Sequence, residues 1–180
     1  MHDISIKQLI ADIDDSTFDI DNGSIINKLR NAYYLQIMKL ASVGEIVVDN
    51  LYTVGYYIIK STVIESSIND FDNEKYGAIL LDVLCIDKRF QSKGYGSVVL
   101  DYIISIAHKF SNLVGCRYLV LNSVREYYKW YKARGFTVSN IEELKNDSPT
   151  ISMYIDFRDN VRIEEYFSEG EEFDGAGRFA

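Results

Sequence analysis

A short glycine-containing segment carries the residue types of an anion-binding loop. Residues 91–96 read Gln-Ser-Lys-Gly-Tyr-Gly, after an apolar run over 78–86 and before a helical apolar pattern over 95–110. The run predicts a buried strand and the pattern predicts an amphipathic helix. The first amides of a helix lack intrahelical acceptors and carry partial positive charge, and the two glycines let successive amides approach one phosphate. With the charge of Lys93, this segment predicts a pyrophosphate-binding loop.

The bare glycine spacing also fits a tight turn that binds nothing. It does not fit the dinucleotide-binding fingerprint, which has three glycines and an acidic residue about 20 positions later. It does not fit a Walker-type loop either, because no Gly-Lys-Ser/Thr follows. An anion site and an empty turn therefore both remain open from the spacing alone.

A second candidate for chemistry is Tyr131, which stands four residues before Gly135. Ser123 and Glu126 have the spacing of a capping box and Gly135 is a natural helix terminator, so we expect a helix over 124–133 and a strand over 136–138. A phenol, whose ordinary pKa is near 10, can donate a proton to a departing thiolate. The chain holds 14 tyrosines, so packing is the simpler explanation of Tyr131 taken alone.

Together the two segments resemble the GNAT (general N-acetyltransferase) superfamily. Residues 84–96 are similar to its acyl-CoA signature, in which Gln-x-x-Gly-x-Gly follows a strand that here ends in Leu-Cys-Ile-Asp. Residues 130–136 are similar to the family's later motif, in which a tyrosine precedes Gly-Phe by four positions. The resemblance implies an α/β fold, a single-domain layered sandwich with a mixed, mostly antiparallel sheet flanked by helices.

The same resemblance implies a reaction in which an amine attacks the acetyl group of acetyl-CoA directly, with no metal. It implies that Tyr131 protonates the departing thiolate. Asp82 stands where many members carry a glutamate, so it is the candidate base, although many members use water chains instead. The residues that the resemblance assigns to acetyl-CoA are Leu84, Cys85, Ile86, Gln91, Ser92, Lys93, Gly94, Tyr95, Gly96 and Ser97.

The acceptor amine is open. Residues 18–36, with Phe-Asp followed by Leu29, Ala32 and Gln36, resemble GNAT-type toxins of toxin–antitoxin pairs, which acetylate the amino group of aminoacyl-tRNA. The cysteine of that pattern is missing here and the spacing is stretched. Three functions follow: an N-acetyltransferase for small-molecule or protein amines, a tRNA-acetylating toxin with an antitoxin partner, or a non-catalytic GNAT-fold module that binds protein. A homodimer is a family-level expectation.

Charge is distributed unevenly along the chain. The net charge is −8, yet residues 88–134 hold nine basic and two acidic residues, so this window carries +7 and the remainder −15. The positive window contains both motifs, and such local asymmetry steers anionic ligands. A solvated helix face explains part of it, particularly Lys129 and Lys132.

Composition favours one compact enzyme domain in the cytoplasm. The hydrophobic fraction is 47% in 180 residues, no apolar run is long enough to cross a bilayer, and no secretory signal is visible. Cys85 and Cys116 have neither metal-ligand nor disulfide-framework spacing. We expect a GNAT-like domain over 1–156 and an acidic extension over 157–180, held by contact with its own domain or with a second subunit.

Local patterns predict an alternating order of elements around these motifs. Strands are expected at 4–10, 78–86, 117–122 and 150–155, and a hairpin at 45–64 that turns at Asp49-Asn50. A helical stripe through Leu29, Tyr33, Ile37 and Leu40 predicts a helix over 26–40. Residues 65–76 are polar without periodicity and are expected to form a loop.

Overall fold

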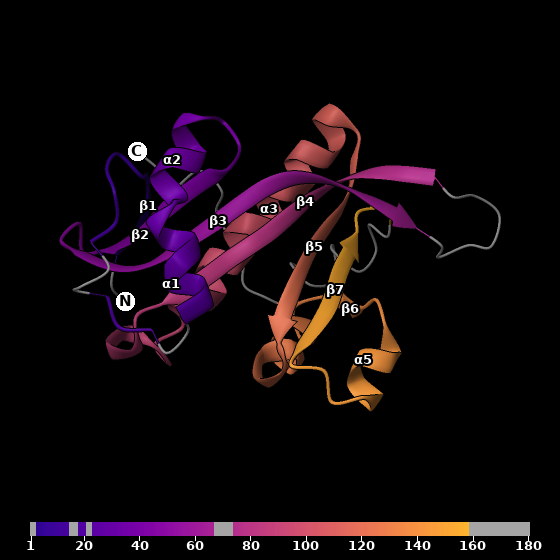
Figure 1. The fold of residues 1–180 in the computed structure, drawn as a ribbon. Helices are drawn as coiled ribbons and strands as arrows, with labels where there is room; N and C mark the ends of the chain where they lie inside the picture. The colour runs from indigo at the N-terminus through magenta and orange to yellow at the C-terminus, as the bar shows by residue number, and fades with distance from the viewer. Residues whose placement is uncertain (1–2, 15–17, 21–22, 67–73, 159–180) are drawn as a thin grey trace. The chain divides into compact units, whose positions relative to one another are not determined.

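The computed structural model describes residues 3–14, 18–20, 23–66 and 74–158 (Figure 1). These residues form two compact units, the first made of residues up to Ser61 with Leu81–Ser105, and the second of Thr62–Leu80 with the residues from Ile106 onward. From residue 159 onward, the predicted acidic extension lies outside the described residues. The domain boundary at 156 stays a prediction.

The described strands belong to a seven-stranded sheet in the order β1-β2-β3-β4-β5-β7-β6, as the mixed α/β prediction required. The pairs β1–β2, β2–β3, β5–β7 and β6–β7 are antiparallel. The strands are β1 Ile4–Gln8, β2 Ser42–Val48, β3 Tyr52–Ser66, β4 Glu74–Ile86, β5 Cys116–Val124, β6 Thr137–Val138 and β7 Thr150–Asp156. The α-helices are α1 Gly23–Arg30, α2 Ala32–Ile37, α3 Tyr95–Val114, α4 Tyr128–Lys132 and α5 Ile141–Lys145, with 3-10 turns η2 Lys88–Phe90 and η3 Arg125–Tyr127.

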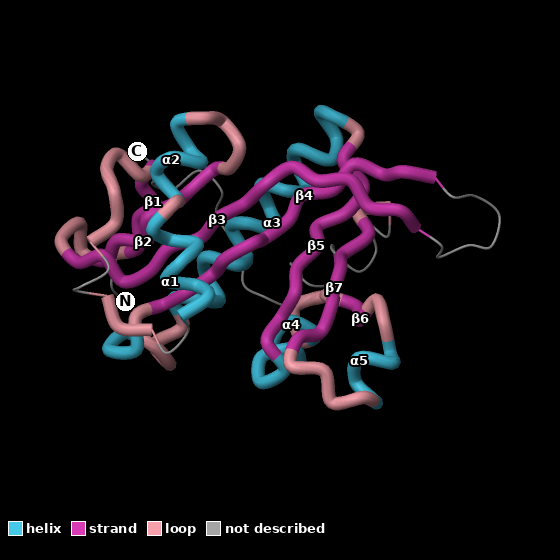
Figure 2. The backbone as a smooth tube through the Cα atoms, in the orientation of Figure 1, coloured by secondary structure: helices cyan, strands magenta, loops and turns pink. Residues whose placement is uncertain are grey.

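The first unit has helices on both faces of its strands. On one face, Leu29 of α1 and Ala32 of α2 are buried in one core cluster with Tyr56 and Ile58 of β3. On the other face, the ring of Tyr57 meets that of Tyr102 on α3, with 6.5 Å between centroids. Figure 2 shows α1 and α2 lying across the strands of this unit. Each buried aliphatic side chain contributes about 1.5–3 kcal/mol, so both helix faces are held by packing and the predicted layered sandwich is confirmed.

The β2–β3 hairpin confirms the predicted turn. Asp49 and Asn50 have φ of 53° and 56°, as a type I′ turn requires at both central positions. The amide of Leu51 donates to the carbonyl of Val48 at 3.1 Å and closes the turn. Asp and Asn adopt this left-handed conformation more readily than most residues, which is why the local sequence was sufficient to predict the turn.

The second unit is built around β5 and β7. Leu121 pairs with Met153 in the antiparallel ladder, and both side chains are buried, as is that of Phe136. At the end of the ladder, Nε of Arg117 donates to both carboxylate oxygens of Asp156 at 3.2 Å, and its Nη2 donates to Oδ2 at 2.8 Å. A charge-assisted pair of this geometry fixes the strand ends.

The predicted helix over 26–40 is wrong in its length and in its buried face. It is two helices, α1 and α2, separated at Asn31, and Ile37 and Leu40 are exposed. The break changes the phase of the second helix, so that Ala32 and Gln36 face inward instead. The Gln36 amide group donates to the Leu9 carbonyl and accepts from the Val43 amide, which satisfies a polar side chain in a buried position.

Two other local predictions also differ from the structure. The expected loop over 65–76 begins and ends in strand, because β3 runs to Ser66 and β4 starts at Glu74; residues 67–73 lie outside the described part. A salt bridge of 3.5 Å joins Lys75 to Glu65 across this hairpin. The α5 helix was not predicted, although Asn140 caps it by accepting the amide of Glu142.

Candidate functional site

The end of β4 forms the strand half of the candidate site. Leu81, Val83 and Cys85 are buried, whereas the alternate residues are half-exposed. The Cys85 thiol lies 3.5 Å from the Tyr56 carbonyl, and burial raises its pKa to about 12. Cys85 therefore stays protonated at neutral pH and packs rather than reacts. The strand ends where the amide of Asp87 donates to the carbonyl of Val54 at 2.8 Å.

A buried carboxylate, Asp87, organises the turn after β4. It caps η2 by accepting the Arg89 amide at 2.9 Å, binds the Arg89 guanidinium at 2.6 Å, and accepts the Asp19 amide at 3.0 Å. The hydrogen bonds from Arg89 lower the pKa of Asp87 to about 2 although burial opposes ionisation. Sequence reasoning placed Asp87 in the motif but missed this role. The role was indicated in the sequence by the position of Asp87, an acidic residue at a strand end two positions before Arg89.

The predicted glycine loop joins β4 to α3 as the sequence indicated. Gly94 has φ of +87°, and a Cβ built on it meets nothing within 4 Å, so the loop surface beside it is open. The amides of Ser97 and Val98 donate to the Gly94 carbonyl at 3.0 and 3.2 Å. The amides of Tyr95 and Gly96 precede these first intrahelical donors. Amides at a helix N-terminus that lack intrahelical acceptors are the donors that bind phosphate groups.

Two side chains of the loop brace it. Gln91 donates from its amide nitrogen to the Ile86 carbonyl at 2.9 Å, so it ties the loop back to the strand. The Lys93 ammonium lies 5.0 Å from the centre of the Phe90 ring, within cation–π range. The ring holds the cation beside the loop, where it adds a full positive charge to the partial charges of the amides.

Tyr131 lies on α4 in the second unit. Its ring meets the Trp130 ring edge-on at 4.7 Å and the Phe136 ring at 5.5 Å. The Tyr131 carbonyl accepts the amides of Arg134 and Phe136 as the chain turns at Gly135, which has φ of +87°. The predicted glycine terminator is confirmed, and the aromatic contacts fix the orientation of the Tyr131 ring.

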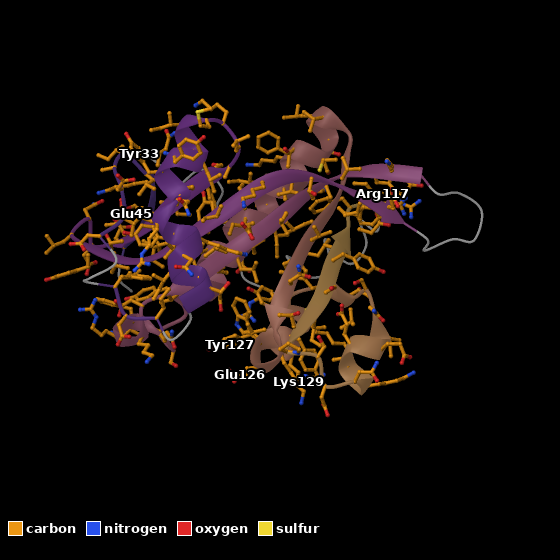
Figure 3. All side chains as sticks on the ribbon, in the orientation of Figure 1. Tyr33, Glu45, Arg117, Glu126, Tyr127 and Lys129 are labelled. Carbon is orange, nitrogen blue, oxygen red and sulfur yellow. The ribbon has the colours of Figure 1, made fainter. Side chains whose placement is uncertain are left out.

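The predicted capping box before this helix is wrong. Ser123 is buried in β5, and its hydroxyl donates to the Val124 carbonyl at 2.8 Å. The chain enters η3 through Val124 without a side-chain cap, and the α-helical segment begins only at Tyr128. The β5–β7 ladder explains the difference, because it pairs Val124 with Thr150 and keeps Ser123 extended. Figure 3 shows Glu126, Tyr127 and Lys129 at this short turn.

Asp82, the candidate base, lies between two ammonium groups of its own unit. Lys28 of α1 and Lys60 of β3 each approach one of its carboxylate oxygens to 2.5 Å. Burial opposes ionisation of this carboxyl, but hydrogen bonds and charge from the two lysines outweigh it and lower the pKa of Asp82. A carboxylate stabilised in this way holds a proton weakly at neutral pH.

The described part of the chain shows neither a candidate metal site nor a candidate membrane-spanning helix. Its His, Cys, Asp and Glu side chains form no group of three or more that could hold a metal ion. None of its helices has the length and apolar character needed to cross a membrane.

The sequence matches no family model and no curated protein. Its fold, with a glycine loop between β4 and α3 and flanking helices on a mostly antiparallel sheet, is GNAT-like, as the motifs predicted. Among solved structures, a tyrosine-to-phenylalanine variant of the AtaT toxin, bound to acetyl-CoA and the C-terminus of the antitoxin AtaR, is similar. It is 19% identical, with a TM-score of 0.71, over 92% of this chain and 99% of its own.

Two further structures extend the likeness. AtaT complexed with acetyl-methionyl-tRNAfMet is 17% identical over 90% of this chain and 99% of its own, with a TM-score of 0.71. A chain of the KacTA–DNA complex is 19% identical over 93% of this chain and 100% of its own, with a TM-score of 0.68. At these identities the comparisons establish the fold.

Proposed function

We propose that this protein is an N-acetyltransferase that uses acetyl-CoA. The observation that carries the proposal is the glycine loop at the start of α3, where open space beside Gly94 adjoins the first amides of a 20-residue helix. A helix of this length has a developed dipole, and its first turn is a natural site for a diphosphate. The likeness in fold supports the same function, since the AtaT variant bound to the C-terminus of AtaR also holds acetyl-CoA.

In the proposed site, backbone groups of residues 84–86 pair with the pantetheine arm and the thioester carbonyl. Residues 91–97 hold the diphosphate, with Lys93 as the charged side chain of the loop. The acceptor amine attacks the acetyl carbonyl carbon, so that a C–N bond forms and the C–S bond breaks. Tyr131 gives its hydroxyl proton to the sulfur and regains a proton from solvent, while the extra proton on the amine nitrogen passes to solvent.

Water is the stronger candidate than Asp82 for removing that ammonium proton. The pKa of Asp82 is lowered and both of its oxygens are already engaged by lysines. General-base catalysis is most effective when the pKa of the base lies near the working pH. We therefore do not assign the role of general base to Asp82.

The acceptor that we propose is the amino group of an aminoacyl-tRNA. AtaT, which is similar over 90% of this chain, is known in complex with acetyl-methionyl-tRNAfMet. The positive window over residues 88–134 suits a polyanionic substrate in a chain whose net charge is otherwise negative. An antitoxin partner belongs to the same proposal, because AtaT binds the antitoxin AtaR.

Transfer of labelled acetyl groups tests the proposal directly. The purified protein is incubated with labelled acetyl-CoA and either charged tRNA, uncharged tRNA, or a panel of small amines and peptides. We expect labelling of charged tRNA only, and growth arrest on expression. Labelling of small amines or peptides without growth arrest would instead make the protein an ordinary N-acetyltransferase. Failure to bind acetyl-CoA would leave a non-catalytic module and refute the proposal.

A further inference from the structure

One cluster of charged side chains in the first unit is not used by the reaction as proposed. Asp82 on β4 is joined to Lys28 of α1 and to Lys60 of β3, both at 2.5 Å, and the Lys28 ammonium also donates to the Asp82 carbonyl at 3.3 Å. The Asp82 side chain is only 11% exposed, whereas that of Lys28 is 44% exposed and that of Lys60 is 29% exposed. The carboxylate lies beneath two cations that solvent can reach.

The cluster carries more positive than negative charge. Among the residues that the structure describes, Asp82 is the only carboxylate within ion-pair distance of either ammonium group. A structural tie between α1 and the sheet needs one lysine and one carboxylate. The second lysine gives the cluster a net charge of +1. The partly buried carboxylate holds both ammonium groups in position, so a second anion could bind them and neutralise the remaining charge.

We propose that the Lys28–Asp82–Lys60 cluster is a binding site for a phosphate group of the acceptor substrate. Asp82 acts in it as an internal counter-ion that orients the two ammonium groups and limits their affinity. This inference rests on the proposed function, since the acceptor is then a nucleic acid. The position is suitable: Asp82 stands two residues before Leu84 on β4, about 7 Å along the strand. Leu84 begins the segment that we assign to the pantetheine arm.

Phosphate fits the cluster better than a carboxylate does. Lysine binds phosphate as a compact point charge with rotatable donors, whereas planar carboxylates are recognised best by the fork of an arginine. Both cations here are lysines, and both ammonium groups converge on the two oxygens of one acid. An RNA phosphate is therefore the favoured ligand and an acidic peptide the competing one.

Binding of uncharged tRNA, followed by fluorescence anisotropy over a range of salt concentrations, tests this site without any requirement for catalysis. We expect Lys28→Met and Lys60→Met each to weaken binding by about 3–10-fold and to reduce the slope of log Kd against log salt by about 0.7–0.9. Asp82→Asn removes the counter-ion, so it should tighten binding by about 3-fold. Lys145→Met is the matched control, because Lys145 forms an exposed salt bridge with Glu142 on α5.

The proposal expects the lysine variants to bind tRNA more weakly and the aspartate variant to bind it more tightly. If the cluster has only a structural role, all three substitutions should weaken tRNA binding or leave it unaltered. Equal sensitivity of hexaglutamate binding to the same variants would overturn the choice of phosphate. If Asp82→Asn abolishes turnover and shifts the pH profile of kcat, Asp82 is a base and the counter-ion role is refuted. Loss of acetyl transfer with the tRNA-binding pattern intact would refute the proposed function alone.

Discussion

The carboxylate of Asp87 accepts the backbone amide of Asp19 at 3.0 Å, across a separation of 68 residues. A second hydrogen bond joins the same two segments, because the Lys88 amide donates to the Asp19 carbonyl at 2.9 Å. One buried acid thus joins the segment before α1 to the turn that leads into the glycine loop. Its ionised state is part of that link, because the charge strengthens every hydrogen bond it accepts.

Asp87→Asn should destabilise the fold in a pH-dependent way. The pKa of Asp87 is about 2, below the ordinary value near 3.9. Its contribution is therefore complete above about pH 5 and is lost as the pH falls toward 2. We expect the variant to lower the free energy of unfolding by about 2 kcal/mol at pH 7 and by much less near pH 2.

Urea unfolding of both proteins at several pH values provides the measurement for this prediction. Asp147→Asn is the control, because Asp147 is 94% exposed and lies 3.8 Å from Arg125, so its change should stay below about 0.5 kcal/mol. If the variant's loss in free energy of unfolding is the same at pH 7 and pH 2, the ionisation of Asp87 contributes nothing to stability.

Tyr131→Phe should lower kcat by roughly 10²–10⁴ if the phenol donates the proton to the sulfur. The substitution keeps the ring contacts with Trp130 and Phe136, so stability and acetyl-CoA affinity should change little. Tyr52→Phe removes an exposed hydroxyl from β3 and serves as the control. Steady-state turnover and calorimetric binding of acetyl-CoA are the two measurements, and unaltered turnover would remove Tyr131 from the mechanism.

The local parts of the candidate site were accessible from sequence because each depends on residues close together in the chain. Gly94 before α3, the terminator at Gly135 and the turn at Asp49-Asn50 are all positions of positive φ, which few residue types adopt readily. Their identity alone therefore predicts a conformation.

The elements that sequence reasoning missed depend on tertiary contacts. Ser123 and Glu126 have the spacing of a cap, but pairing of β5 with β7 holds Ser123 in a strand. Gln36 is buried because it bonds the backbone of Leu9 and Val43, which no helical periodicity indicates. The two lysines around Asp82 are 54 and 22 residues away from it in the chain, so local sequence patterns could not predict this cluster either.

Gly94→Ala should weaken acetyl-CoA binding without unfolding the protein. At φ of +87° an alanine is strained by about 1–2 kcal/mol, and relief of that strain moves the amides of the loop. Gly115→Ala is a matched control, because Gly115 also has positive φ, +68°, and a Cβ there also meets nothing within 4 Å. We expect similar losses of thermal stability in both, but at least a tenfold rise in the Kd for acetyl-CoA only in the first.

Calorimetric titration of both variants with acetyl-CoA decides this prediction. If the two variants bind acetyl-CoA alike, the loop geometry at Gly94 does not matter for the cosubstrate. If the Gly94→Ala variant binds acetyl-CoA normally while its thermal stability falls, the backbone strain does not move the loop amides proposed to contact the ligand. In that case the diphosphate is held by groups other than the loop amides.

Gly55→Ala tests how closely β3 approaches the end of β4. A Cβ at Gly55 would lie 2.3 Å from the Cys85 carbonyl oxygen and 2.8 Å from the Ile86 side chain. A backbone oxygen cannot rotate away, so the strands must separate beside the segment proposed to bind the pantetheine arm. We expect a loss of about 1–3 kcal/mol in the free energy of unfolding, together with weaker acetyl-CoA binding.

Gly77→Ala on β4 is the control for Gly55→Ala, since a Cβ there meets its neighbours at 3.6–3.7 Å, an ordinary contact distance. Chemical denaturation and acetyl-CoA titration of the two variants should therefore differ clearly. Equal stability would mean that β3 and β4 accommodate a methyl group without moving. In that case the close approach of these strands does not determine the position of the Leu84–Ile86 backbone, and acetyl-CoA affinity should be unchanged as well.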